Sequence, residues 1–158
     1  MPTRSKLLPL VFAAALAAIS SPASAAMEPE PIDALAERDQ DFARGRHAVQ
    51  AKDWDAAIKA FHVAEKRDGR NAEIQNMLGY AYRNAGKLDV AFKHYQRALQ
   101  IDPRHIWAHE YIGEAYLMAK NPAKAEEHLA ALRRLCPSAC EERDELARKI
   151  KQYRAANK

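Results

Sequence analysis

The chain has 158 residues, and its net charge is +4, from 25 Lys and Arg against 21 Asp and Glu. This length allows one ordinary domain and is short for two. Charges of opposite sign are interleaved along the chain, which gives no reason to expect a nucleic-acid partner.

The N-terminal residues 1–25 have the layout of a secretory signal peptide. Arg4 and Lys6 form a positive start, residues 7–19 are apolar, and Ala23-Ser24-Ala25 offers the small residues that a signal peptidase reads. A transmembrane anchor is the alternative, but a bilayer span needs about 20 apolar residues. We expect cleavage after residue 25 and a mature, periplasmic protein of charge +2 without a stable membrane anchor. A eukaryotic secretory lumen is the alternative compartment.

The segment after the predicted cleavage site, residues 26–32, contains Met27-Glu28-Pro29-Glu30-Pro31-Ile32. Its prolines and charges predict an extended lead-in rather than a helix. The first helix is expected near Asp33, and the domain is expected to cover residues 33–156.

Five columns of residues recur with a period of 34 residues. They are Gly45, Gly79 and Gly113; Ala57, Ala91 and Ala125; Phe61, Tyr95 and Leu129; Ala64, Ala98 and Leu132; and Gly69, Pro103 and Pro137. Five columns that agree on one period indicate an internal repeat built from one structural unit.

The second copy, with Leu78-Gly79-x-x-Tyr82, Ala91-x-x-x-Tyr95 and Pro103, resembles the tetratricopeptide-repeat motif. The third copy keeps most of the motif and the first is degraded. The resemblance covers residues 38–139. It implies an all-α, right-handed solenoid of three helical hairpins, at about 38–71, 72–105 and 106–139, whose apolar faces are buried only by stacking.

Helix boundaries can be placed from capping residues. Asp53 and Asn121-Pro122 are predicted to begin the second helices of the first and third hairpins. Ser138-x-x-Glu141 reads as a capping box that opens a closing helix over about 138–155. Leu146, Ile150 and Tyr153 recur at helical spacing in that helix, so we expect them to pack on the third hairpin.

Cys136 and Cys140 are the only cysteines, and they flank the corner before the closing helix. In an exported protein this arrangement favours a structural disulfide. A redox-active thiol pair and a soft-metal site are the alternatives. His105 and His109, four residues apart on a helix, also suit a metal, although packing against the neighbouring helix is the simpler interpretation. We therefore expect neither a metal nor a cofactor.

The resemblance also implies a concave groove lined by the first helix of each repeat. Carried over residue by residue, the candidate binding positions are Phe42, Arg46, Asn76, Tyr80, Arg83, Asn84, Trp107, Glu110 and Glu114. The same set of positions includes Asp39, Val49, Gln50, Glu73, Leu117 and Met118. We expect these side chains to contribute to binding and little to stability. Some members of the family hold a C-terminal carboxylate through lysine and asparagine, and that clamp is not reproduced here.

No catalytic motif is present: the chain lacks a glycine-rich phosphate loop, H-E-x-x-H and G-x-S-x-G. We therefore expect a non-enzymatic adaptor or assembly factor of the cell envelope, whose groove holds a partner peptide or helix. One alternative is a thiol- or metal-handling protein that uses Cys136 and Cys140. The other is a self-associating subunit, or one whose own lead-in fills the groove.

Overall fold

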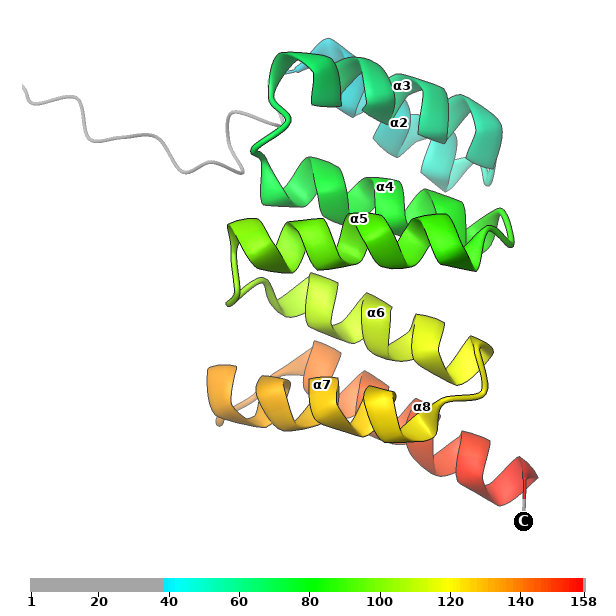
Figure 1. Ribbon diagram of the computed structural model, residues 1–158, viewed down its shortest axis with the longest axis vertical. Helices are drawn as coiled ribbons and strands as arrows, with labels where there is room; N and C mark the ends of the chain where they lie inside the picture. The colour runs from blue at the N-terminus through cyan, green and yellow to red at the C-terminus, as the bar shows by residue number, and fades with distance from the viewer. Residues whose placement is uncertain (1–38, 158) are drawn as a thin grey trace, which may run out of the picture.

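The computed structural model describes residues 39–157, and this part of the chain folds into seven α-helices (Figure 1). The helices are α2 (Gln40–Gln50), α3 (Trp54–Arg67), α4 (Ala72–Asn84), α5 (Leu88–Ile101), α6 (Ile106–Met118), α7 (Pro122–Leu135) and α8 (Glu141–Ala156). The first six form three hairpins that follow one another along the long axis of the molecule, and α8 closes the stack. The all-α solenoid is confirmed. No helix within residues 39–157 is both long and apolar enough to cross a membrane.

The predicted signal peptide, the lead-in and a helix start near Asp33 lie outside the described residues. Helix α2 begins at Gln40, because the backbone of Asp39 is extended and its carboxylate accepts hydrogen bonds from the Asp41 and Phe42 amides. The predicted caps are confirmed further along the chain. Asp53 accepts from the Ala56 amide at 3.0 Å, and Asn121 accepts from the Lys124 amide at 3.1 Å with Pro122 following it.

The glycine column marks the closest approach of helices. A Cβ atom on Gly79 would lie 2.6 Å from the Tyr95 ring, and Gly45 faces Phe61 in the same way. In the third hairpin the pattern changes, because a Cβ on Gly113 would lie 2.6 Å from Leu146 of α8. The column residue there, Leu129, is smaller than Tyr95, so the closing helix supplies the side chain that covers the glycine.

The closing helix packs as expected, but it begins differently. Leu146 and Ile150 are buried with side chains of α6 and α7, and Tyr153 packs at the edge of the same cluster. The predicted capping box at Ser138 is wrong: Cys140 is the N-cap residue, without a side-chain cap, and α8 starts at Glu141. The turn is held instead by Arg143, whose Nη1 donates to the carbonyl oxygens of three turn residues, Cys136, Pro137 and Ser138.

Candidate functional site

The first helices of the three hairpins, α2, α4 and α6, line one cavity of about 350 Å³. Its walls are formed by Phe42, Arg46, Glu73, Asn76, Met77, Trp107 and Tyr111. We call this cavity the groove cavity. Its residues meet because positions that recur on successive first helices fall on one face of the stack. Four of the nine candidate binding residues therefore lie together: Phe42, Arg46, Asn76 and Trp107.

Met77 was not among the predicted groove positions. The column that contains it runs Ala43, Met77 and Tyr111, one residue after Phe42, Asn76 and Glu110. Ala43 is too small to signal a groove position. The two large side chains that follow at the same spacing are the only sign in the sequence that this column reaches the cavity.

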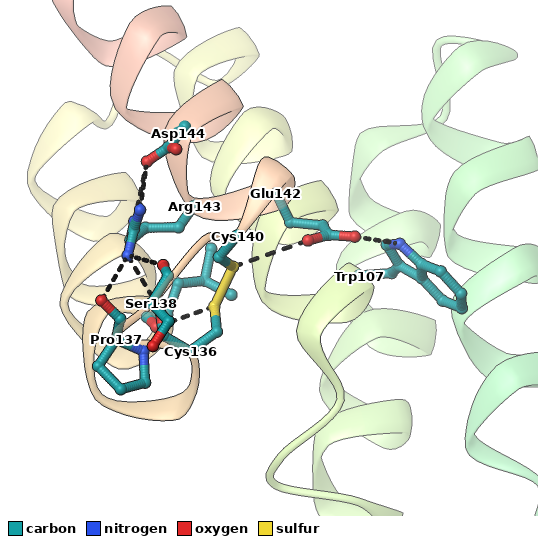
Figure 2. The surroundings of a disulfide bond; sticks show 9 residues. Trp107, Cys136, Pro137, Ser138, Cys140, Glu142, Arg143 and Asp144 are labelled. Atoms are coloured by element: carbon teal, nitrogen blue, oxygen red, sulfur yellow. Dashed lines mark hydrogen bonds and ion pairs between the residues drawn. A yellow bond between two sulfur atoms is a disulfide. The ribbon is translucent and has the colours of Figure 1, made fainter.

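Trp107 offers the most accessible apolar surface of this cavity. It is 48% exposed, and its indole Nε1 donates to Glu142 Oε1 of α8 at 2.8 Å (Figure 2). About half of the side chain is therefore accessible, while its Nε1 is bound to the closing helix. Aromatic side chains held in this way bind with little loss of conformational entropy.

Tyr80 and Tyr111 form a second aromatic element on α4 and α6. Their ring centroids are 5.0 Å apart, and the guanidinium carbon of Arg83 lies 5.2 Å and 5.5 Å from the two centroids. This cation–π geometry joins adjacent hairpins. Burial raises the pKa of the Tyr111 hydroxyl, so the ring stays neutral.

Arg83 and Glu114 are buried as an ion pair and are not exposed groove residues. The structure therefore predicts a contribution to stability, against the expectation that they contribute little to it. Their side chains are 9% exposed and pair with each other across α4 and α6. The second oxygen of Glu114 binds Lys149 of α8. One carboxylate thus joins three helices. Removing one member of a buried ion pair leaves an uncompensated charge, which typically costs about 3–5 kcal/mol.

Two more candidate residues have mainly structural contacts. Phe42 is 1% exposed, and its ring packs on Phe61 with a centroid distance of 5.5 Å, so it forms the floor of the cavity and part of the core. Asn84 is exposed, and its amide donates to the Tyr80 carbonyl oxygen at 2.8 Å. This bond lies within α4, between residues four apart.

The polar wall of the groove cavity is a small hydrogen-bonded group centred on Glu73. Asn76 Nδ2 lies 3.3 Å from Glu73 Oε2, and His105 Nε2 lies 3.0 Å from the same oxygen. His105 Nδ1 accepts from the Ala108 amide, so its Nε2 carries the proton that is donated to Glu73. Asn76 Oδ1 is buried and has no partner among the described residues.

Glu110 is the equivalent of Asn76 in the third hairpin, 34 residues later. Its side chain is buried, at 8% exposure, and no hydrogen bond or ion pair to it is found within residues 39–157. Burial, together with the negative charges of Glu114, Glu142 and Glu145, raises the pKa of Glu110 from 4.5 to about 7. Lys149 acts in the opposite direction.

The two cysteines lie at the corner between α7 and α8 (Figure 2). Their sulfur atoms are bonded to each other, and the Cα atoms are 5.9 Å apart. Cys136 is the C-cap of α7 and Cys140 the N-cap of α8. The bridge therefore joins the end of the third hairpin to the helix that carries Glu142.

The histidine pair of α6 is occupied by hydrogen bonds. His105 caps the helix and binds Glu73, as described above. His109 Nε2 donates to the Pro103 carbonyl oxygen at 3.1 Å, and its Nδ1 lies 3.0 Å from His128 Nδ1 of α7. Across residues 39–157 no group of three His, Cys, Asp or Glu side chains is placed to hold a metal ion.

A stack of helical hairpins with a groove along its first helices defines a class of protein-interaction module. Two models described as "Tetratricopeptide repeat" match the chain, over residues 42–106 and 84–138. The chain belongs to the tetratricopeptide-repeat family.

One curated protein and two solved structures illustrate what the chain is similar to. Protein O-mannosyl-transferase Tmtc3 of Drosophila melanogaster is 31% identical over 87 residues, which is 55% of this chain but only 9% of that protein. The TPR2B domain of yeast Sti1, in a complex with pHsp70, aligns with a TM-score of 0.66 and 25% identity, over 74% of this chain and 96% of the domain. The type III secretion translocator chaperone SycD of Yersinia enterocolitica aligns with a TM-score of 0.66 and 18% identity, over 75% and 83% of the two chains.

Proposed function

We propose that this protein is an exported, periplasmic adaptor or assembly factor that holds a peptide segment or helix of a partner protein in the groove cavity. The observation that carries the proposal is the cavity itself, where a half-exposed, anchored Trp107 lies beside buried polar groups. Aromatic anchors next to a few placed hydrogen-bonding groups are typical of surfaces that bind other proteins.

The similarity to peptide-binding domains supports the same role. The Sti1 domain that shares this fold is seen in a complex with pHsp70, and SycD is a chaperone for secretion translocators. The ligand of this groove is not expected to be a C-terminal carboxylate held in a clamp. Phe42 and Trp107 stand at groove positions where such clamps use polar residues.

The export step has a direct test. The N-terminal charge pattern and the Ala23-Ser24-Ala25 site motivate cleavage after residue 25. Intact-mass measurement of protein recovered from the periplasm of an expressing bacterium should give a chain that starts at Ala26. A full-length mass, or protein retained in the cytoplasm, contradicts the export proposal.

Partner binding can be mapped with a photo-crosslinking amino acid. We would place p-benzoyl-phenylalanine at Trp107 in the groove and, as the matched control, at Val63, an exposed apolar residue of α3. Crosslinking in the native envelope should give a defined adduct from the groove position and not from Val63. The captured protein is then purified, and Trp107→Ala should weaken its binding by about ten-fold or more, as expected for an aromatic anchor. Adducts at Val63 alone would place the partner on the second helices.

A further inference from the structure

Among the side chains that line the groove cavity, one buried polar atom lacks a hydrogen-bond partner within residues 39–157, and it is an acceptor, Asn76 Oδ1. Arg83 Nε, a buried donor without a partner in the same range, belongs to a residue outside this lining. The Asn76 side chain lines the cavity and is 1% exposed, and its Nδ2 is directed to Glu73. Its Oδ1, on the other side of the amide, has no hydrogen-bond partner among the described residues. A buried amide oxygen without a donor is costly, so this atom favours a ligand that brings a donor.

Glu110 does not line the groove cavity, but it adds a buried carboxylate on the same face of α6 as Trp107 and Glu114, because residues three and four apart on a helix are neighbours. It is 8% exposed and has no ion-pair partner within residues 39–157. Lys149, the cation that stabilises its charged form, is already bound to Glu114 and lies 3.2 Å from Glu145. A carboxylate that is buried without its own cation is stabilised by an incoming positive charge.

Two aromatic side chains of α6 can also attract a positive charge. Trp107 and Tyr111 are four residues apart on α6 and both line the cavity, and the negative face of an aromatic ring attracts ammonium and guanidinium groups. Arg46 of α2 is the cation already present in the lining of the cavity. The residues that α4 and α6 contribute to the lining include the acceptor Asn76, the carboxylate of Glu73 and two aromatic rings.

We propose that the partner segment bound in this groove presents a lysine or arginine side chain whose charged head is received by Asn76 and Glu73 beside Trp107, with Glu110 adding negative charge one turn further along α6. This inference rests on the proposed protein-binding function and specifies the chemistry of the partner. It also disfavours the chain's own residues 27–32 as the occupant, because that segment contains Glu28 and Glu30 and no basic residue.

The test uses the full-length protein and a phage-displayed library of random peptides as the probe. Peptides whose binding depends on Trp107, judged by its loss in Trp107→Ala, are sequenced and aligned. They should share a lysine or arginine at one aligned position. Replacing a shared lysine by norleucine, which keeps the aliphatic stem but not the charge, should weaken binding by about ten-fold or more, since a charge-assisted hydrogen bond is lost.

The protein side is tested with carboxylate-to-amide variants. Glu73→Gln and Glu110→Gln should each reduce the difference between the lysine and norleucine peptides. Glu127→Gln is the matched control, because it removes one charge from an exposed position on α7, outside the groove. A charge-reversed pair, Glu110→Lys with the peptide lysine changed to glutamate, should recover part of the lost affinity.

The outcomes separate this inference from the proposed function. Trp107-dependent peptides without a shared basic residue, or equal binding of the lysine and norleucine forms, overturn the basic-residue inference and leave the groove function intact. A selection that yields only peptides indifferent to Trp107→Ala counts against the groove function itself, and against this inference with it.

Discussion

The guanidinium of Arg83 on α4 is bound to the carboxylate of Glu114 on α6, and both side chains are 9% exposed. The two residues stand at concave positions of adjacent hairpins, where a partner was expected to bind. They instead hold those hairpins together, while Lys149 extends the pair to α8. These two concave positions therefore join neighbouring hairpins, and they lie outside the lining of the groove cavity.

We predict that Glu114→Gln lowers the free energy of unfolding by about 3–5 kcal/mol, because it leaves the buried Arg83 without its carboxylate. Arg83→Met should cost less, because Glu114 keeps its pair with Lys149. The Arg83→Met/Glu114→Gln double variant should lose less than the sum of the two. Urea denaturation of the four proteins measures this coupling. Lys124→Met is the control: its side chain is 47% exposed and its partner Glu127 is 61% exposed, so its effect should be small. Additive losses would show that the pair contributes no coupling energy.

The repeat period predicted the three hairpins, because a period compares each copy with the next, and Asp53 and Asn121 predicted two helix starts. The candidate groove positions came from the resemblance to the tetratricopeptide repeat. Neither the period nor the resemblance could predict which groove residues are buried by pairing. Arg83 and Glu114 are 31 residues apart, and Glu114 and Lys149 are 35 apart. Such a contact depends on the side chain that the neighbouring hairpin presents, and the two partners occupy different columns of the repeat.

The start of α8 shows the same limit at a local scale. Ser138 and Glu141 have the spacing of a capping box, but Arg143 satisfies the carbonyl groups of the turn, and the Cys136–Cys140 bridge closes it. The capping-box motif spans only four residues, and the contacts of Arg143 and the disulfide determine the conformation of the turn instead.

Gly113→Ala should loosen the closing helix. The new Cβ would lie 2.6 Å from Leu146 of α8, and overpacking of this kind costs about 1–3 kcal/mol. Hydrogen exchange should therefore increase most in α8, with a lower melting temperature by circular dichroism. Leu146→Ala in the same chain makes room for the new methyl group, so the double variant should be more stable than the two separate effects predict. Unchanged exchange in α8 would contradict this account.

We predict that Cys136 and Cys140 form a disulfide in exported protein. Mass measurement with alkylation should reveal two reactive thiols only after reduction. The closed loop is short, so the chain-entropy contribution is only about 2 kcal/mol. Because Arg143 also holds the turn, reduction alone should leave α8 docked, whereas reduction of Arg143→Ala should release it. Two alkylated thiols in native, unreduced protein would contradict the pairing and favour a thiol-handling role.

The His109–His128 pair predicts a loss of stability in acid. His109 Nε2 donates to Pro103, so its Nδ1 accepts a hydrogen bond from His128 Nδ1 at 3.0 Å. Burial and the neighbouring His109 lower the pKa of His128 from 6.5 to about 4, with Glu127 and Lys124 as the other nearby charges. The folded state therefore binds this proton less readily than the unfolded state. Stability conferred by neutral His128 is present above pH 6.5 and is lost as the pH falls toward about 4.

Glu110 acts with the opposite sign, since its raised pKa makes the folded state bind a proton more readily. Its unfavourable contribution grows as the pH rises from about 4.5 to about 7. The measurement should therefore use Glu110→Gln as the background. Urea midpoints across this range should fall with acid in that background and fall less when His128→Gln is added. If the urea midpoints fall equally with acid in the presence and absence of His128, the titration of other groups causes the loss of stability.

The last prediction concerns the bond between Trp107 and Glu142, by which α8 positions the main aromatic side chain of the groove. Glu142→Leu removes the acceptor, whereas Glu142→Gln keeps an amide oxygen that can replace it. In a Trp54→Phe background, where Trp107 is the remaining tryptophan, Glu142→Leu should shift the fluorescence emission of Trp107 to longer wavelength and lower its anisotropy. Glu142→Gln should change neither.

The Glu142→Leu variant should also weaken peptide binding. Ordering one side chain costs about 0.5–1.5 kcal/mol on binding, so Glu142→Leu should weaken the binding of a groove-dependent peptide by about two- to twelve-fold. The bond lies at the surface, so the melting temperature should remain nearly constant. If Glu142→Leu leaves both the fluorescence and the affinity unchanged, Trp107 is fixed by its other neighbours, such as the His105 ring at 6.3 Å, and the closing helix does not organise the site.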